Sequence, residues 1–394
     1  MAKRKKVVRT KRIYRGPSKR TRSVLRALLF LLILLVLVVA GYFLSMGFSA
    51  LFANGDNAPE SSAESALLPE SSEEGTPESS EESSKEESSE PPVEEPDIKG
   101  LTVSFDAARL SGDALDNYLN ERKAEGYTHI FVELKNVNGY VLFKTDAPQA
   151  VGFGSVTNGA FDAEVFTAAV KKAGMIPAAK ITTLRDPLVA HVRNGNSFAH
   201  SSSREVNWLD YSPELGGKPW LNPYMEKARG YIVELTEDAI DKGFEMIVLS
   251  DVNFPTRTSP SMDTIVKEPS RNAILGQLLN EVQAAAGDVP VLNSVNLAEQ
   301  FMLTDKVPFA DMLEIGYTTN APYISLAAIE WNKPYLAEKF SVENDGVAIA
   351  RAMLTRFKSQ TALTEMFVPM IAQSDADVLL PILKELGIEE YIVL

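Results

Sequence analysis

The chain of 394 residues contains no cysteine and only three histidines, His129, His191 and His200. Without cysteine there is no disulfide framework, no zinc–thiolate site, no iron–sulfur cluster and no thiol nucleophile. Three scattered histidines do not predict a metal centre built on several imidazole ligands. No G-x-G-x-x-G sequence follows the first expected strand and no Walker A sequence occurs, so a bound nucleotide is not predicted either. We therefore expect no metal and no cofactor.

Positive charge is scarce beyond the N-terminal region, and the whole chain has a formal net charge of −14. Residues 1–26 hold twelve Lys and Arg and no acid, whereas residues 54–97 hold fifteen acids and one Lys. Residues 98–394 hold 26 basic and 38 acidic residues. Because an acidic surface repels phosphates, nucleic acid is not an expected partner of this last region.

A single uncharged run of 29 residues lies between Arg26 and Asp56, and its first part is almost entirely Leu, Val, Ile, Phe and Ala. About 20 apolar residues suffice for a helix to cross a bilayer core. A cleaved signal peptide is the alternative, but its apolar region is usually shorter. We expect an uncleaved signal anchor over residues 27–48. The basic tail, residues 1–26, predicts a single-pass protein of the cell membrane with a cytoplasmic N-terminus and an extracellular C-terminal domain.

Residues 54–97 are dominated by Ser, Glu and Pro. Such a composition cannot bury a core, and its like charges repel one another. We expect a disordered, extended linker between the anchor and the domain of residues 98–394.

Residues 98–394 alternate short β-rich runs with segments of helical periodicity, which predicts an α/β fold with a parallel sheet. Strands are expected at 101–105, 129–134, 176–181, 245–249, 289–293, 312–315, 366–371 and 391–394. Helices are expected at 113–123, 163–172, 225–241, 271–285, 347–357 and 376–386. Eight strands in a region of this size indicate a (β/α)8, TIM-barrel-like domain. An open doubly wound sheet is the alternative.

Strand periodicity predicts which charged side chains enter the barrel. In the second strand the apolar set Ile130, Val132 and Leu134 suits the helix side, which leaves Glu133 and Lys135 facing inward. The same reasoning places Lys180 and Glu314 inward on later strands. Charges inside a barrel are costly unless they are paired or functional. The four groups are therefore either a structural ion network or a polar site for a hydroxyl-rich ligand.

Loop residues add weaker candidates to this set. Asp186 and Asp251 follow strands, where a carboxylate can serve catalysis but also caps helices and turns. Ser250 lacks the G-x-S-x-G context of an activated serine. Trp220 offers a face on which a sugar ring stacks, although aromatic residues also serve as packing residues.

Four segments together resemble a family of glycoside-hydrolase barrels found on bacterial surface proteins. They are FVELKNVNGYV at 131–141, KITTLRDPLVA at 180–190, WLNPY at 220–224 and LSDVNFP at 249–255. Their order and spacing are more specific than any one segment, and the resemblance covers roughly residues 99–296. It implies a barrel fold and a polysaccharide or cell-wall glycan as the partner.

The resemblance also implies roles for individual residues. Glu133 and Asp251 are the carboxylates in the matched segments that are expected to act in catalysis. Glu314 lies beyond these segments and is expected to act with them because strand alternation places it inside the barrel. The residues expected to bind substrate are Lys135, Asn136, Lys180, Asp186, Trp220, Asn222, Ser250 and Asn253. The chain departs from the family pattern at several of these positions. Acids of the pattern are replaced by Asn136, Asn222 and Ser250, and an arginine is replaced by Asn253. Asp251 lies one residue after the position at which the pattern has an acid.

These departures leave two main functions open. The first is an anchored hydrolase that acts on a glycan, since paired carboxylates at strand ends suit glycosidic bond cleavage. The second is a non-catalytic protein that binds carbohydrate or supports the cell envelope, since an amide cannot replace a catalytic acid. A cleft lined by Asn136, Asn222, Asn253 and aromatic residues, without a second acid, would favour the second. A structural domain with an inert interior is a third possibility.

Overall fold

The computed structural model describes residues 97–190, 196–255, 269–302, 320–360 and 366–394, all within one compact unit, Glu90–Leu394. The predicted tail, anchor and linker lie outside the described residues, as do the expected strand at 312–315, Glu314 and His191. None of the helices in the described ranges has the length and apolar content required to span a bilayer.

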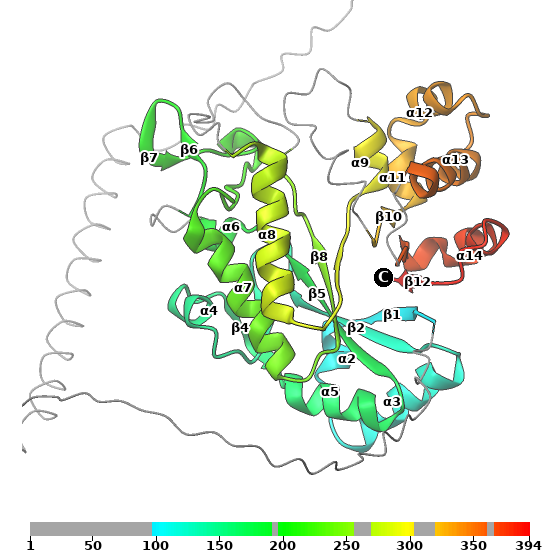
Figure 1. Ribbon diagram of the computed structural model, residues 1–394, viewed down its shortest axis with the longest axis horizontal. Helices are drawn as coiled ribbons and strands as arrows, with labels where there is room; N and C mark the ends of the chain where they lie inside the picture. The colour runs from blue at the N-terminus through cyan, green and yellow to red at the C-terminus, as the bar shows by residue number, and fades with distance from the viewer. Residues whose placement is uncertain (1–96, 191–195, 256–268, 303–319, 361–365) are drawn as a thin grey trace, which may run out of the picture. The chain divides into compact units, whose positions relative to one another are not determined.

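The described residues form an α/β fold around a curled, mainly parallel sheet (Figure 1). The strands of its main path follow the order β10-β11-β12-β1-β2-β5-β8-β9, and every neighbouring pair in this order is parallel. Their bounds are β1 Lys99–Val103, β2 His129–Lys135, β5 Ile176–Thr182, β8 Met246–Ser250, β9 Val291–Asn293, β10 Tyr323–Ile324, β11 Met370–Ile371 and β12 Tyr391–Val393.

The two ends of this path approach each other just beyond β9. Asn296 forms an isolated parallel bridge with Tyr323. The Tyr323 N–H donates to the Val295 carbonyl at 2.7 Å, and the Ala321 N–H donates to the Asn293 carbonyl at 3.1 Å. The carboxyl end of β9 and the residues that follow it therefore lie beside the start of β10, although the two strands are far apart in the path.

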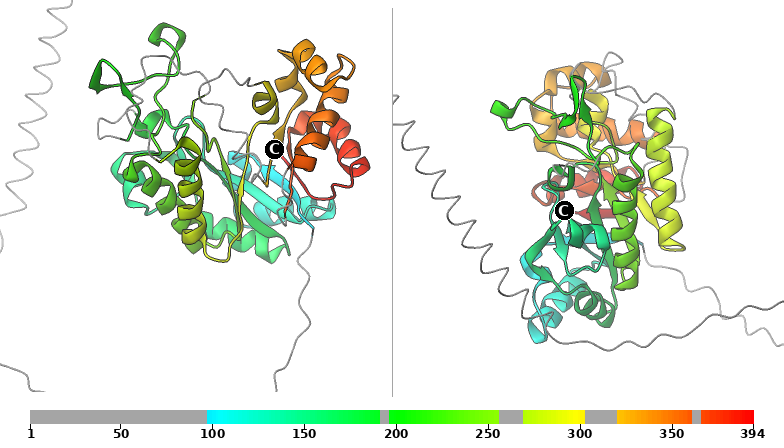
Figure 2. Two further views of the ribbon diagram at one scale, coloured as in Figure 1. Left: turned by 45° about the horizontal axis from the view of Figure 1, so that its top comes forward. Right: turned by 90° about the vertical axis from the view of Figure 1, so that its left-hand side faces the viewer.

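Helices follow the strands at the predicted positions. They are α3 Asp113–Ala124, α5 Ala163–Lys172, α7 Glu226–Asp241, α8 Arg271–Ala286, α13 Gly346–Gln360 and α14 Ala376–Glu385. Asp162 caps α5 by accepting a hydrogen bond from the Val165 N–H, and Ser270 caps α8 through the Ala273 N–H. Figures 1 and 2 show α7 and α8 lying side by side along the sheet.

Short elements that the sequence did not predict fill the connections. They are α2 Phe105–Ala108, β3 Val141–Phe143, α4 Pro148–Gly152, β4 Val156–Phe161, α6 Pro187–Ala190, β6 Ala199–His200, β7 Ser203–Asn207, η1 Pro213–Leu215, α9 Leu297–Met302, α11 Leu326–Glu330, α12 Lys333–Phe340 and η2 Gln373–Asp375. Segments of two to eight residues are too short to show a clear hydrophobic period.

Two separate apolar clusters confirm the predicted alternation along β2. Ile130, Val132 and Leu134 belong to the larger cluster between the sheet and the helices. Phe131 belongs to a smaller cluster on the opposite, inner face. That inner cluster also contains Ala178, Met246, Val248, Leu292, Met370 and Ile392. Apolar side chains therefore pack the inner face of the sheet.

Candidate functional site

A cavity of about 310 Å³ opens at the carboxyl ends of the strands. Residues at or just after the ends of β2, β5, β8, β9, β10, β11 and β12 contribute to its wall. The lining residues are Val137, Lys180, Arg185, Ser250, Asp251, Asn253, Ser294, Val295, Asn296, Glu299, Tyr323, Met370 and Leu394. Parallel strands bring the functional residues of barrel enzymes to this same edge, so this cavity is the candidate site.

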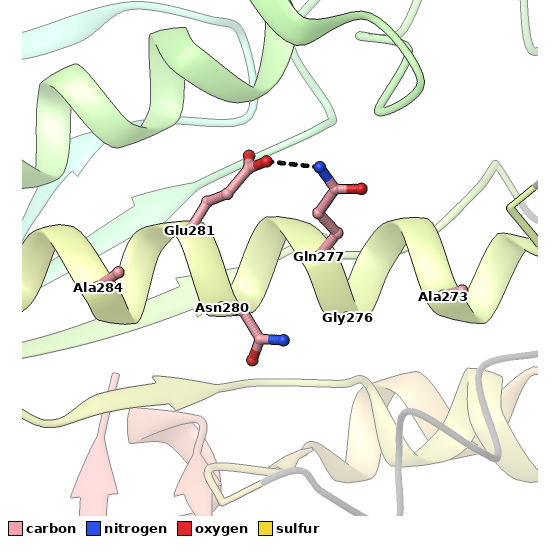
Figure 3. Close-up of a pocket in the computed structure, with 6 residues that line it drawn as sticks. All are labelled: Ala273, Gly276, Gln277, Asn280, Glu281 and Ala284. Atoms are coloured by element: carbon pink, nitrogen blue, oxygen red, sulfur yellow. Dashed lines mark hydrogen bonds between the residues drawn. The ribbon is translucent and has the colours of Figure 1, made fainter.

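A larger hollow of about 660 Å³ lies along helix α8 and is lined by six residues of that helix alone (Figure 3). Its one carboxylate, that of Glu281, accepts hydrogen bonds from Gln277 at 2.7 Å and from Arg229 at 2.8 Å. Because this acid is already bonded and no other element lines the hollow, we do not take it as the site.

Glu133 and Lys180 form an ion pair across β2 and β5. Register places them directly opposite each other, and Lys180 Nζ lies 3.2 Å from Glu133 Oε1. Their side chains keep 31% and 21% exposure, so the pair is accessible to solvent. Lys180 also lines the cavity, which places the Glu133 carboxylate beside the site.

Asp251 follows β8 in a left-handed backbone conformation, with φ of 56°. A non-glycine residue seldom adopts this conformation without support from its surroundings. Asp251 lies one residue later than the acid of the family pattern, and the left-handed backbone leaves both Ser250 and Asp251 in the cavity wall. Burial raises the pKa of the Asp251 carboxyl. The cations Arg185, Lys180 and Lys135 and a hydrogen bond from Ser250 oppose the rise.

A second acid, Glu299 on α9, faces the same cavity. Glu299 is exposed to solvent. The enclosing protein raises the pKa of Glu299, the Asp251 carboxylate raises it further, and Arg185 lowers it. Two carboxylates and the Arg185 guanidinium thus influence one another within one cavity. No group of histidines and acids suited to a metal ion occurs within the described ranges.

A family model with the description "Putative glycosyl hydrolase domain" matches residues 100–305, more than half of the chain. The chain belongs to this family. The matched range contains Lys180, Asp251 and Glu299, whereas the cavity residues Tyr323, Met370 and Leu394 lie beyond it.

Solved structures give remote similarities. A hypothetical protein from Ruminiclostridium thermocellum ATCC 27405 is 17% identical over 49% of this chain and 95% of that chain, with a TM-score of 0.42. The α-galactosidase TtGalA from Thermus thermophilus is 13% identical over 50% of this chain and 38% of that chain, with a TM-score of 0.34. A GH20 exo-β-N-acetylglucosaminidase from Vibrio harveyi is 11% identical over 70% and 41%, with a TM-score of 0.39. The chain thus spans less than half of the length of the two glycosidases. Curated protein sequences include no significant match.

Lys135 and Asp186 were predicted to bind substrate, but neither of them lines the cavity of this glycosyl hydrolase domain. Glu133 pairs with Lys180 but Lys135 pairs with Ile181, so β2 carries a bulge between them. The extra residue turns Lys135 to the face occupied by Ile181, toward the helices. Lys135 and Asp186 are both completely buried there, with Nζ and Oδ2 3.0 Å apart.

Three further predicted binding residues also lie outside the cavity wall. Asn136 accepts hydrogen bonds from the N–H groups of residues 138 and 140 and so shapes the β2–β3 turn. Trp220 is buried and donates from Nε1 to Asp210 Oδ2 at 3.1 Å. Asn222 accepts from the Tyr224 N–H at the turn before α7. Of the predicted amides and hydroxyls, Ser250 and Asn253 line the cavity.

Arg185, Glu299 and Tyr323 line the cavity but were not predicted as site residues from the sequence. Arg185 directly precedes Asp186 in a segment that the resemblance had marked. Glu299 and Tyr323 reach the cavity only because β9 and β10 meet beside each other. Position after a predicted strand was the one signal that could have found Glu299, which lies six residues beyond β9.

Proposed function

We propose that this protein hydrolyses glycosidic bonds of a polysaccharide or cell-wall glycan in the cavity at the carboxyl ends of its strands. The observation that carries the proposal is a pair of carboxylates, Asp251 and Glu299, that line one cavity and each have a raised pKa. A raised pKa favours the protonated carboxyl group that must donate a proton to the leaving glycosidic oxygen.

Asp251 is the proposed general acid because it is the less exposed of the two acids and burial raises the pKa of its carboxyl group. Glu299, which is exposed to solvent, is the proposed second carboxylate, acting on the sugar or on water. The Asp251 carboxylate raises the pKa of Glu299, because like charges oppose simultaneous ionisation. The ion pair of Glu133 and Lys180 offers hydrogen-bonding partners for sugar hydroxyls. A catalytic role for Glu133 or Glu314 stays a prediction.

The competing proposal of a non-catalytic carbohydrate-binding protein rested on a cleft of amides without a second acid. Asn253 lines the cavity, but Asn136 and Asn222 do not, and Glu299 supplies a second acid. The site therefore supports hydrolysis better than binding alone.

The test is a hydrolysis screen of the full chain in detergent against a panel of polysaccharides, with release of reducing ends as the readout. We expect Asp251→Asn and Glu299→Gln each to lower the rate at least 100-fold, the scale of a lost acid–base group. Glu133→Gln should weaken substrate binding more than it lowers turnover. Glycan binding without hydrolysis by the unmodified chain would select the non-catalytic alternative.

We also propose that the curled sheet is a complete (β/α)8 barrel, which the bridge between Asn296 and Tyr323 supports. For the N-terminal residues we propose a membrane anchor at 27–48 with the domain outside the cell, supported by the apolar run and the basic tail before it. Because the chain has no cysteine, a cysteine introduced at Ser201 or at Ala2 gives a clean topology test. An impermeant thiol reagent on whole cells should label the first variant and not the second.

A further inference from the structure

We propose that the buried Lys135–Asp186 ion pair is a positioning pair that holds the segment after β5, and through it Arg185 and Asp251, at the wall of the cavity. The inference assigns no substrate contact to either residue. A test of this inference by enzyme kinetics rests on the proposed function, whereas a test by hydrogen exchange does not.

Lys135 ties the end of β5 from behind. Its Nζ donates to the carbonyl oxygens of Thr182 at 2.7 Å and Thr183 at 3.1 Å, and it lies 5.8 Å from the centre of the Tyr231 ring on α7. The ammonium is thus held between the sheet and α7. It fixes the backbone at the point where β5 leaves the sheet.

Asp186 holds the other end of the same short segment. Its Oδ2 pairs with Lys135, while its Oδ1 accepts from the N–H groups of Leu188 at 3.0 Å and Val189 at 2.8 Å. The carboxylate therefore binds the first turn of α6 to the buried ammonium. The β2–β3 turn packs against it so closely that a Cβ on Gly139 would lie 2.2 Å from Oδ1.

Backbone hydrogen bonds connect this segment to the site. Thr183 donates to the Ser250 carbonyl from both its N–H and its Oγ1, each at 2.9 Å. The Leu184 N–H donates to the Asp251 carbonyl at 3.4 Å. Arg185 is the next residue and lines the cavity. A left-handed conformation such as that of Asp251 persists only where the surroundings enforce it, and these bonds are the enforcing contacts on one side.

A purely structural ion pair would make a different prediction. Such a pair could be replaced by neutral groups of similar shape without a specific effect on the cavity, because removing both charges leaves no uncompensated charge behind. A positioning pair, once neutralised, should leave the fold intact and loosen the segments at 182–186 and 250–251.

The test is hydrogen exchange of the full chain in detergent, measured by mass spectrometry, for the double variant Lys135→Met/Asp186→Asn. The asparagine keeps an oxygen acceptor for the first turn of α6, and the methionine removes the donor to the two carbonyls. We expect a melting temperature close to that of the unmodified chain. Peptides covering 182–190 and 249–254 should exchange at least tenfold faster, and α3 should not change.

The matched control is Arg229→Met/Glu281→Gln, which removes a different ion pair that is partly buried. Like Lys135, Arg229 donates to a backbone carbonyl, that of Pro223. Unlike the Lys135–Asp186 pair, the pair of Arg229 and Glu281 joins α7 to α8. It should leave exchange at 182–190 and 249–254 unchanged. Equal effects of the two double variants on these peptides, or no effect of the first, would overturn the proposal.

A milder variant covers the case in which the first double variant does not fold. Thr183→Val leaves the ion pair but removes one hydrogen bond to the Ser250 carbonyl, and it should speed exchange at 249–254. Unchanged exchange in Thr183→Val would then overturn the proposal. If a substrate is found in the hydrolysis screen, the folded double variant should have a kcat at least 100-fold lower and a KM changed less than threefold. The acid limb of its pH–rate profile should also shift.

The charged groups that act on the Asp251 carboxyl group during such a pH titration are Arg185, Lys180 and Glu299 in the cavity wall and Lys135 behind it. Failure of the unmodified chain to hydrolyse any glycan would count against the proposed function alone, because the exchange experiment needs no substrate.

Discussion

At the residue scale, the position of Asp251 depends on an unfavourable backbone conformation. Its φ of 56° is sterically costly for a residue with a Cβ, while its carboxyl group is removed from water. Strain and desolvation in one residue are typical of a site where function, rather than stability, determines the side chain.

Replacing Asp251 with glycine should therefore stabilise the fold. Glycine adopts the left-handed region freely and carries no buried carboxyl group, so Asp251→Gly should raise the free energy of unfolding by about 1 kcal/mol. Urea unfolding measures the change. Asp251→Asn keeps the Cβ and is the control, and its free energy of unfolding should rise less than that of Asp251→Gly. A destabilised glycine variant would contradict the interpretation of strain.

His129, at the opposite end of β2, makes a contribution to the free energy of unfolding that depends on pH. Its side chain is buried, and burial lowers the pKa of its imidazole from 6.5 to about 4. Because the folded state binds this proton less readily than the unfolded state, the contribution is complete above pH 6.5 and is lost as pH falls toward 4.

Between pH 7 and pH 4 the protein should lose up to about 3 kcal/mol of unfolding free energy through His129 alone. The measurement is urea unfolding at a series of pH values. In His129→Phe this part of the pH dependence should disappear. A variant with the same slope as the unmodified chain would assign the loss to other groups.

At the scale of elements, the bulge in β2 decides which charges reach the cavity. Strict alternation predicted that Glu133 and Lys135 would share a face. One extra residue between them leaves Glu133 opposite Lys180 and turns Lys135 toward the helices. Bulges are set by pairing with the neighbouring strand and by the turn that follows, and neither is visible in the periodicity of one strand.

The turn after this bulge should tolerate no side chain at Gly139. A Cβ there would lie 2.2 Å from Asp186 Oδ1, and φ is +84°. Gly139→Ala should cost about 2 kcal/mol or more of unfolding free energy through strain and the displaced carboxylate. Gly126→Ala is a matched control, since its φ is +94° but its surroundings are open. Equal losses would show that φ alone matters.

Helices were more predictable than strands. The expected helices at 113–123, 163–172 and 271–285 match α3, α5 and α8 to within one residue, because each has several turns of apolar periodicity. Strand β10 has two residues and was missed, while the expected strand at 312–315 lies outside the described residues. So short a strand is recognised by its pairing partners and not by its composition.

At the scale of the whole molecule, contact between β9 and β10 brings the two ends of the sheet path together and completes the cavity wall. Tyr323→Pro removes the N–H that donates to the Val295 carbonyl. The change should cost about 2 kcal/mol, the scale of a buried carbonyl left without a partner. Tyr323→Phe keeps the backbone donor and should have little effect on stability. Thermal unfolding compares the two, and similar melting temperatures would argue against closure at this point.

The amino-acid sequence by itself determined the alternation of strands and helices, the separation of inner and outer apolar faces along β2, and the resemblance to a glycosyl hydrolase family. These properties depend on local periodicity and on short segments in order. Only the tertiary structure decided that Asp251 and Glu299 share a cavity and that Lys135 and Asp186 lie behind it. Those placements depend on a bulge, on a left-handed residue and on the meeting of two distant strands, and each of these is stabilised by contacts between segments far apart in the chain.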